Sequence, residues 1–345
     1  MSLLLDVVRI KNGGGNMLFA NAAAHFCVDG LCATVLFGKL PAEKEFLILL
    51  YNTLAFSTQC IVGLLADRLK RQAGAELCSA LLLLSGWIMP LPPILRVVLI
   101  GFGNSLFHVT GGIETLQRCH GKSWSLGVFV APGALGLSLG VAFPQFGGFF
   151  AAGVFLFVCC ACLMENRSLP DTVEHTENDS LTEPILLTVA VAVRAVGGSA
   201  VSFPWKTGLM WTMILTVFVV LGKIAGGFLC DCLGPSGTAL WTVPAAAVLV
   251  AFLSAYAVPS VIGQFLVNLS MPVTLWLLFR MLPDAPGFAF GLAASALWPG
   301  TIAGQMMLLT GPALWVCVLI SFCFSLAAIL LADRKLHPTS VRKEN

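Results

Sequence analysis

A polar break between two long apolar runs reads Gly63-Leu-Leu-Ala-Asp67-Arg68-Leu-Lys70-Arg71. A second break without basic residues, Gly227-Phe-Leu-Cys-Asp231-Cys-Leu-Gly234, lies at the same kind of junction in the second half of the chain. Two related breaks at equivalent junctions indicate an internal duplication. Repeated groups of membrane helices are typical of secondary transporters, in which one half moves against the other around a central site. We therefore expect a duplicated membrane protein.

The composition places most of the chain in lipid. Of its 345 residues, 58% are apolar and 10% are charged, and the mean hydropathy is +0.91. A bilayer core of about 30 Å requires about 20 apolar residues per helix. Unpaired backbone groups are so costly in hydrocarbon that only helices and closed barrels can cross it. The uninterrupted apolar runs favour helices, so we predict an all-α integral membrane protein.

Pro, Gly and charged residues divide the apolar sequence into twelve predicted transmembrane helices. The predicted spans are 16–38, 45–66, 73–90, 94–115, 125–144, 146–164, 185–203, 208–231, 237–257, 260–280, 284–306 and 311–332. The acidic segment 165–184 is interpreted as a solvated cytoplasmic linker. It separates an N-terminal six-helix bundle, residues 1–164, from a C-terminal one, residues 185–345, and the repeat predicts that the two bundles are pseudo-symmetric.

Basic residues set the expected orientation. Placing both termini in the cytoplasm puts most Lys and Arg residues of the loops and tails on the cytoplasmic side, as the positive-inside rule requires. We therefore expect a multi-pass protein of the cytoplasmic (inner) membrane. The net charge of +2 and the position of the basic residues at helix ends do not indicate a nucleic-acid partner.

The twelve cysteines predict neither a disulfide framework nor a metal centre. Most lie inside apolar spans, where Cys serves as a small packing residue. Cys230 and Cys232 flank Asp231, but neither a CxxC pair nor a His lies near them in the sequence to complete a tetrahedral metal set. The sequence also lacks an HExxH motif and paired catalytic carboxylates at membrane depth. We expect no cofactor, no metal and no enzymatic activity.

The two Asp residues each end the second helix of a half, where a carboxylate can meet the N-terminal dipole of a helix across the repeat interface. The first break resembles the Gly-x-Leu-Ala-Asp-Arg-x-Gly-Arg-Arg motif of the major facilitator superfamily, although Lys70 replaces a glycine and Gln72 the last arginine. The second break lacks the basic residues. The resemblance implies a conformational latch, firmer for Asp67 than for Asp231, formed by Gly63, Asp67, Arg68, Arg71 and Asp231.

Two further segments resemble the same superfamily. Ala131-Pro132-Gly133-Ala-Leu-Gly136-Leu-Ser-Leu-Gly140 looks like the Gly/Pro-rich part of its fifth helix, and Trp298-Pro299-Gly300 echoes it in the eleventh. Small residues at this spacing let helices approach closely and slide. We expect this of Pro132, Gly133, Gly136, Gly140, Pro299 and Gly300.

Within the superfamily, two segments are similar to fosmidomycin-resistance-type exporters. They are His25-Phe-Cys-Val-Asp29 in the first span and Gly101-Phe-Gly103-Asn104-Ser-Leu-Phe107-His108 in the fourth. This resemblance implies export of a drug-like compound. The sequence Val109-Thr110-Gly111-Gly112 departs from the pattern of that group.

Ionisable residues within a span are costly unless they face protein or water, so they are functional candidates. His25 and Asp29 share one helix face and form either a proton-coupling site or a structural hydrogen bond. Asn104 and His108 repeat the spacing, and the superfamily resemblance implies that they face the same central cavity. Packing is the alternative for His108.

Arg194 lies deep in its span and requires an anion. This anion is Asp29, another carboxylate, or an acidic group of the substrate, which suits the planar guanidinium. We expect Arg194 to switch between an internal carboxylate and the cargo. In the tenth span, Asn268, Ser270 and Thr274 form a polar, irregular stretch suited to substrate contact.

The sequence thus predicts a secondary active transporter that moves a small organic molecule by proton-coupled alternating access. The proposed proton-coupling residues are His25, Asp29, His108 and Arg194; the substrate-binding residues are Asn104, His108, Arg194, Asn268, Ser270 and Thr274. The resemblance favours export by antiport, whereas a buried Arg favours uptake or exchange of an organic anion. A scaffold or sensor is a remote alternative. We expect a monomer whose partners are substrate, protons and lipid.

Overall fold

The computed structural model describes residues 14–69, 72–119, 121–164 and 180–336, which are helical and contain no strand. The first half contains α2 (Gly14–Gly38), α3 (Glu45–Asn52), the π-helix η1 (Thr53–Ser57), α4 (Gln59–Leu69), α5 (Gln72–Ile88), α6 (Pro93–Arg118), α7 (Ser123–Ala142), the short η2 (Pro144–Phe146) and α8 (Gly147–Met164). The second half contains α9 (Thr182–Ser199), α10 (Gly208–Phe252), α11 (Ala257–Met281), α12 (Pro286–Met306) and α13 (Gly311–Leu336).

Most helices begin and end within a few residues of the predicted spans, but three spans differ. The second is divided into α3, η1 and α4, while the eighth and ninth form one element, α10, that is kinked between them. A straight helix of 45 residues would be about 68 Å long, which is more than twice the thickness of a bilayer core. Gly234, with φ 74° and ψ 168°, interrupts the helical geometry of α10 and is followed by Pro235.

The predicted number of twelve spans is not confirmed. Within the described residues, eight helices are long and apolar enough to cross a membrane, with α10 counted once and α3, η1 and α4 counted together. The helix α5 is apolar but shorter. At the predicted linker, α9 already begins at Thr182, so the last residues of segment 165–184 are helical, and residues 165–179 lie outside the described part.

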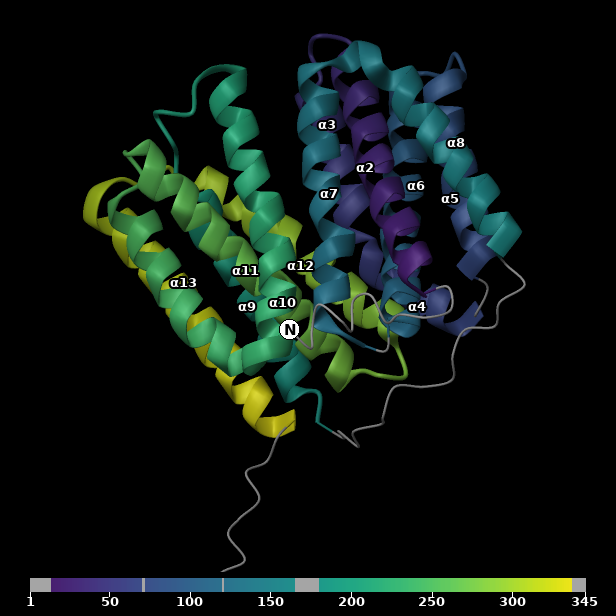
Figure 1. The fold of residues 1–345 in the computed structure, drawn as a ribbon. Helices are drawn as coiled ribbons and strands as arrows, with labels where there is room; N and C mark the ends of the chain where they lie inside the picture. Colours follow the sequence, from purple (N-terminus) through teal and green to yellow (C-terminus); the bar gives the residue numbers. More distant parts are fainter. Residues whose placement is uncertain (1–13, 70–71, 120, 165–179, 337–345) are drawn as a thin grey trace, which may run out of the picture.

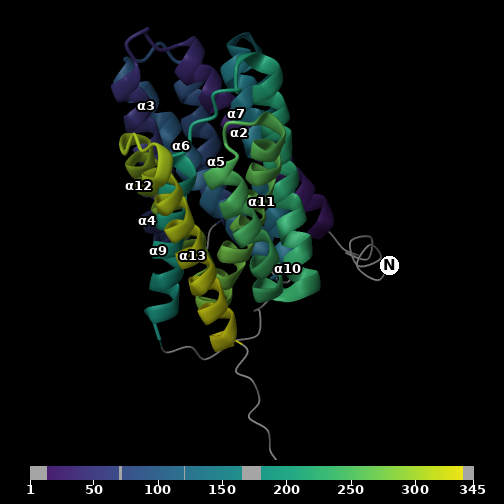
Figure 2. The same ribbon diagram turned by 90° about the vertical axis from the view of Figure 1, so that its left-hand side faces the viewer.

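The helices form two bundles that lie side by side. Figure 1 shows the first half in purple to teal and the second in green to yellow; the ribbons approach each other at the lower end and diverge towards the upper end. Figure 2 shows from a second direction that the long helices run roughly along one common axis. The end at which the bundles approach each other carries both α4 and the start of α12.

Two large hydrophobic clusters fill the bundles. The first joins side chains of α2, α5, α6, α7 and α8, such as Leu31 and Phe129, and it extends into the second half through Leu275, Phe279 and Phe290. The second joins α9 to α13 and includes Val250 and Phe322. Large apolar side chains are exposed on the outside, for example on Trp241, as is expected of a surface that faces lipid.

Candidate functional site

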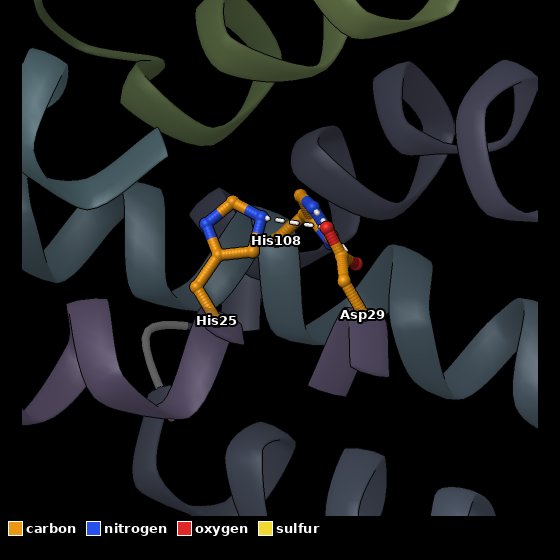
Figure 3. Close-up of side chains that lie close together, drawn as sticks. All are labelled: His25, Asp29 and His108. Carbon is orange, nitrogen blue, oxygen red and sulfur yellow. Dashed lines mark ion pairs between the residues drawn. The ribbon is translucent and has the colours of Figure 1, made fainter. Parts of the chain in front are cut away.

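His25, Asp29, Asn104 and His108 lie together between α2 and α6. His25 Nε2 is 3.3 Å from Asp29 Oδ2, and His108 Nε2 is 3.8 Å from Asp29 Oδ1, as Figure 3 shows. Asn104 Nδ2 donates a hydrogen bond to Asp29 Oδ1 at 2.9 Å. The two imidazole rings meet edge to face, with centroids 4.3 Å apart. The structure therefore brings together four residues that the sequence placed on two separate spans.

The hydrogen bonds of the two rings determine which nitrogen carries a proton. His25 Nδ1 lies 2.8 Å from the carbonyl oxygen of Phe129, and His108 Nδ1 lies 2.9 Å from the carbonyl oxygen of Asn104. A carbonyl oxygen only accepts, so each Nδ1 must be the donor. In a neutral ring the other nitrogen then has a lone pair. Both Nε2 lone pairs consequently point towards the carboxylate of Asp29.

The helix α7 covers this cluster closely because residue 133 is glycine. A Cβ atom at Gly133 would collide with His25 Nε2 and Asp29 Oδ2. Pro132 precedes it inside α7, and a Pro in a helix removes one backbone hydrogen bond and bends the helix. Gly136 and Gly140 continue the close approach, since their Cβ atoms would meet the backbone of Phe26 and Gly30 of α2.

Replacement of Gly133 by Ala is therefore expected to separate His25 from Asp29. The added methyl group overpacks a filled site, which costs about 1–3 kcal/mol and should lower the melting temperature. Gly148→Ala is the matched control, because a Cβ there meets no atom within 4 Å and should be neutral or stabilising by about 0.5–1 kcal/mol. Equal melting temperatures for the two variants would contradict this assignment.

A cation of the other bundle faces the cluster. Lys223 of α10 donates through Nζ to the carbonyl oxygen of Val130 at 3.3 Å, and its ammonium group interacts electrostatically with Asp29 and His108. Its position shows that the cluster lies at the contact between the two bundles.

Arg194 does not join this cluster. Its guanidinium donates to Ser325 Oγ of α13 at 3.1 Å and to Thr274 Oγ1 of α11 at 3.3 Å. Among the described residues it has no ion pair, so the expected pairing with Asp29 is not present. The reason is the rotation of α9, which turns the side chain towards helices of its own bundle.

The other predicted substrate residues of α11 bond within their own helix. Asn268 Nδ2 donates to the carbonyl oxygen of Gln264, and Ser270 Oγ donates to that of Val267. Thr274 also donates to its own helix and in addition accepts from Arg194. Of the three, only Thr274 lies beside a charged side chain within the described residues.

Asp67 binds the start of a helix in the other bundle. Its two carboxylate oxygens accept hydrogen bonds from the backbone N–H groups of Gly287 and Phe288, both at 2.8 Å. These are the second and third residues of α12, whose first N–H groups have no partner within the helix. Arg68 is exposed, and Arg71 lies outside the described residues.

Asp231, in the second bundle, makes the corresponding contact with a helix of the first bundle. Its oxygens accept from the N–H groups of Ser123 at 3.0 Å and Trp124 at 2.9 Å, at the start of α7. Each polar break therefore places a carboxylate at the positive end of a helix of the other bundle. The Asp231 contact is as complete as that of Asp67, although its sequence motif is poorer.

Glycines allow the bundles to touch beside these carboxylates. A Cβ at Gly63 would collide with the backbone of Gly287, and a Cβ at Gly227 would meet Ser123 and Trp124. Within the second bundle, Gly300 of α12 packs in the same way against Ala192 of α9, next to Pro299 inside α12. Of the predicted helix-sliding residues, Gly133, Gly136, Gly140 and Gly300 lie at such close contacts, and their role in sliding stays a prediction.

A polar contact nearer the middle of the interface involves the π-helix. Ser295 Oγ of α12 lies 3.1 Å from the carbonyl oxygen of Phe56 and 3.2 Å from that of Ser57, and it accepts from the N–H of Cys60 at 3.0 Å. A π-turn leaves backbone groups without their usual partners and is common at functional sites. Ser295 satisfies these groups from the other bundle.

Glu76 is a buried acidic residue that was not among the candidates from the sequence. Glu114 accepts from Arg118 at 3.3 Å and from Asn21 Nδ2 at 3.1 Å. Glu76 of α5 is buried and interacts electrostatically with Glu114 and Arg118. It is the only acidic residue in the predicted span 73–90, and that isolation was the signal that could have identified it.

A spacing typical of hydrolases also occurs in the chain. Gly136-Leu-Ser138-Leu-Gly140 matches GxSxG, but that motif requires a strand-to-helix turn. Here it lies inside α7, and Ser138 forms a hydrogen bond with Thr216 of α10 at 2.8 Å. The segment serves helix packing at the contact between the bundles.

Comparisons with known proteins complete this description. No family model matches the sequence, and no curated protein matches it. The chain is similar to the solved structure of FucP, a major facilitator superfamily transporter in the outward conformation, with 12% identity and a TM-score of 0.70 over 91% of this chain and 98% of that one. It is also similar to a variant of the E. coli fucose:proton symporter FucP, with 13% identity and a TM-score of 0.64 over 93% and 98%. The chain has the fold of major facilitator superfamily transporters.

Proposed function

We propose that this protein is a secondary active transporter that couples the movement of a small organic molecule to protons. It works by alternating access in the cytoplasmic membrane, as a monomer with both termini in the cytoplasm. The observation that carries the proposal is the convergence of His25, Asp29 and His108 at the contact between the two bundles.

The three groups require at least one proton. With both Nδ1 atoms donating to backbone carbonyls, two lone pairs and a carboxylate face one another when no further proton is present. Three acceptors without a donor between them are unfavourable in a buried site. A proton between Asp29 and either imidazole removes this conflict. The cluster therefore gains and loses protons in place, as a coupling site must.

Protonation also changes the attraction between the bundles. Ionised Asp29 attracts Lys223 of the second bundle, whereas the protonated acid does not. A proton therefore alters the relative stability of two arrangements of the bundles, which is how a bound species shifts a conformational equilibrium. The carboxylates of Asp67 and Asp231 stabilise the arrangement described here.

A direct test uses purified protein in proteoliposomes that contain a pH-sensitive dye. Addition of candidate compounds across an imposed pH gradient should cause a proton movement that depends on both protein and compound. One charge moving through 100 mV supplies about 2.3 kcal/mol, equivalent to an about fifty-fold gradient. If no compound in a broad panel of neutral, cationic and anionic molecules moves protons, and a constant protein partner is found instead, a scaffold or sensor role is favoured.

The proposed direction is export by proton antiport. It is supported by the resemblance of the first and fourth spans to fosmidomycin-resistance-type exporters, now joined by the contact of His25 and Asp29 with His108. The alternative is uptake or exchange of a small organic anion. It is favoured by Arg194, which is buried and has only hydroxyl partners among the described side chains.

Replacement of Arg194 by Ala separates these two functions. If Arg194 binds an anionic group of the cargo, its removal should weaken anion transport by about 30-fold or more, since truncating one partner of a buried charge pair costs about 2–5 kcal/mol. Counterflow with neutral, cationic and anionic compounds measures the preference. Arg194→Lys is the control, because it keeps the charge but not the planar fork. An unchanged selectivity in Arg194→Ala would exclude the anion carrier.

A further inference from the structure

We propose that His25, Asp29 and His108 form a binding site for one divalent transition-metal ion. One ligand atom of each residue lies within 4.8 Å of the other two. The ion would be bound by Nε2 of both rings and one oxygen of Asp29, from α2 and α6 together (Figure 3). The sequence did not suggest this site, because its metal candidates were the cysteines.

The donor set selects the class of ion. Two imidazoles and one carboxylate on one side of an ion are typical of Fe²⁺, Zn²⁺ and Co²⁺, and they leave coordination positions open for water or another ligand. Ca²⁺ and Mg²⁺ prefer sets made of oxygen atoms. We therefore expect binding of borderline transition metals and no measurable competition from Ca²⁺ or Mg²⁺.

The hydrogen-bond partners of the three proposed ligands are arranged like the outer shell of a metal site. A metal-binding His usually donates its other N–H to a carbonyl or carboxylate, which fixes the tautomer and aims the free lone pair. His25 and His108 each do so, through Phe129 and Asn104. The side chain of Asn104 in addition holds Asp29 through its Oδ1.

The distances require only a small closure. Zinc bonds of about 2.0–2.1 Å to nitrogen and oxygen place tetrahedral ligands about 3.4 Å apart. His25 Nε2 and Asp29 Oδ2 are already 3.3 Å apart, and His108 Nε2 is 3.8 Å from the other oxygen, Oδ1. With one oxygen of Asp29 as the ligand, the three ligand atoms lie within 4.8 Å of one another. Side-chain rotations shorten the remaining separation. Gly133 leaves no side chain between α7 and these ligand atoms.

The charge around the site gives a second, independent expectation. One carboxylate and two neutral rings carry a charge of −1, and the ammonium group of Lys223 is close enough to interact with Asp29 and His108. Like charges repel, so Lys223 opposes a divalent ion. Removal of this amine should therefore strengthen metal binding, whereas removal of a ligand should weaken it.

The inference uses the residues of the proposed proton site but does not depend on transport. A metal ion and a proton need the same Nε2 lone pairs, so one excludes the other. Binding is measured on the purified protein in detergent, without a gradient. Failure of metal binding and failure of proton coupling are therefore separate results.

The test is titration of chelator-treated protein with Co²⁺ and Zn²⁺, followed by visible absorption and calorimetry. We expect one ion per chain and a Co²⁺ spectrum of nitrogen and oxygen ligation. His25→Asn and His108→Asn keep an N–H donor near the Nδ1 position and remove Nε2, and each should weaken binding by about 100-fold or more. Asn104→Ala should weaken it by about 10- to 100-fold, as outer-shell changes do, and Lys223→Met should strengthen it.

Replacement of His120, His175 and His337 by Asn is the control for binding elsewhere in the chain, and it should leave the affinity unchanged. The melting temperature without metal shows whether each variant is folded. The proposal is overturned if folded protein binds no Co²⁺, if both His→Asn ligand variants bind as tightly as the parent protein, or if the spectrum shows thiolate ligation. Proton-driven transport in a protein that binds no metal would overturn the metal site and leave the proposed function standing.

Discussion

Asp29→Asn is expected to abolish accumulation of cargo driven by a pH gradient. The amide cannot take up a proton, and its nitrogen can donate to His25 Nε2, which lies 3.3 Å from the carboxylate in the parent protein. The conflict among three acceptors then disappears without any proton. The accumulation ratio should fall from an about fifty-fold limit per 100 mV to one, while cargo still equilibrates across the membrane.

The measurement compares accumulation and counterflow in the same proteoliposomes. Loss of accumulation with retained counterflow identifies a coupling residue, because counterflow needs the conformational change but no gradient of protons. Glu45→Gln is the control, since it makes the same carboxyl-to-amide change at an exposed position of α3. Accumulation by Asp29→Asn under an imposed pH gradient would remove Asp29 from the coupling role.

Asp67→Ala and Asp231→Ala are expected to loosen the contact between the bundles to the same extent. Each carboxylate accepts two backbone hydrogen bonds at the start of a helix, at 2.8–3.0 Å. Hydrogen bonds to charged groups contribute about 1.5–3 kcal/mol each. A total loss of about 3 kcal/mol corresponds to an about 100-fold shift of the equilibrium towards the separated arrangement.

Hydrogen exchange followed by mass spectrometry measures this effect. Asp67→Ala should increase exchange in peptides from the start of α12, and Asp231→Ala in peptides from the start of α7. Glu45→Ala serves as the control, because it removes a carboxylate at an exposed position of α3. The sequence resemblance ranked Asp67 above Asp231. A large effect for Asp67 alone would show that the motif matters more than the observed contacts.

The sequence predicted those features that depend on a local property of the chain. Apolar length located the helices, and the four-residue spacing placed His25 with Asp29 and Asn104 with His108. It could not give the rotation of each helix, which side-chain packing sets. For this reason Asp29 was one of the partners considered for Arg194, whereas Arg194 lies beside Ser325 and Thr274.

Contacts between segments that are distant in the chain could not be predicted from the sequence either. The position of Lys223 beside the cluster depends on how the second bundle docks, and no local pattern encodes it. The proposed metal-ligand set was missed because His25, Asp29 and His108 were grouped as a proton-coupling site and only the cysteines were considered as metal ligands. The break between the eighth and ninth spans within α10 depends on the conformation of Gly234, which the residue type allows but does not require.

The acceptors that fix the two imidazoles are main-chain atoms of Phe129 and Asn104. Side-chain replacement at residue 129 leaves its carbonyl oxygen in the chain. The tautomers therefore depend on the path of the backbone and not on the type of side chain at residue 129. Only a change that redirects the helix, such as loss of the bend at Pro132, would release the ring of His25.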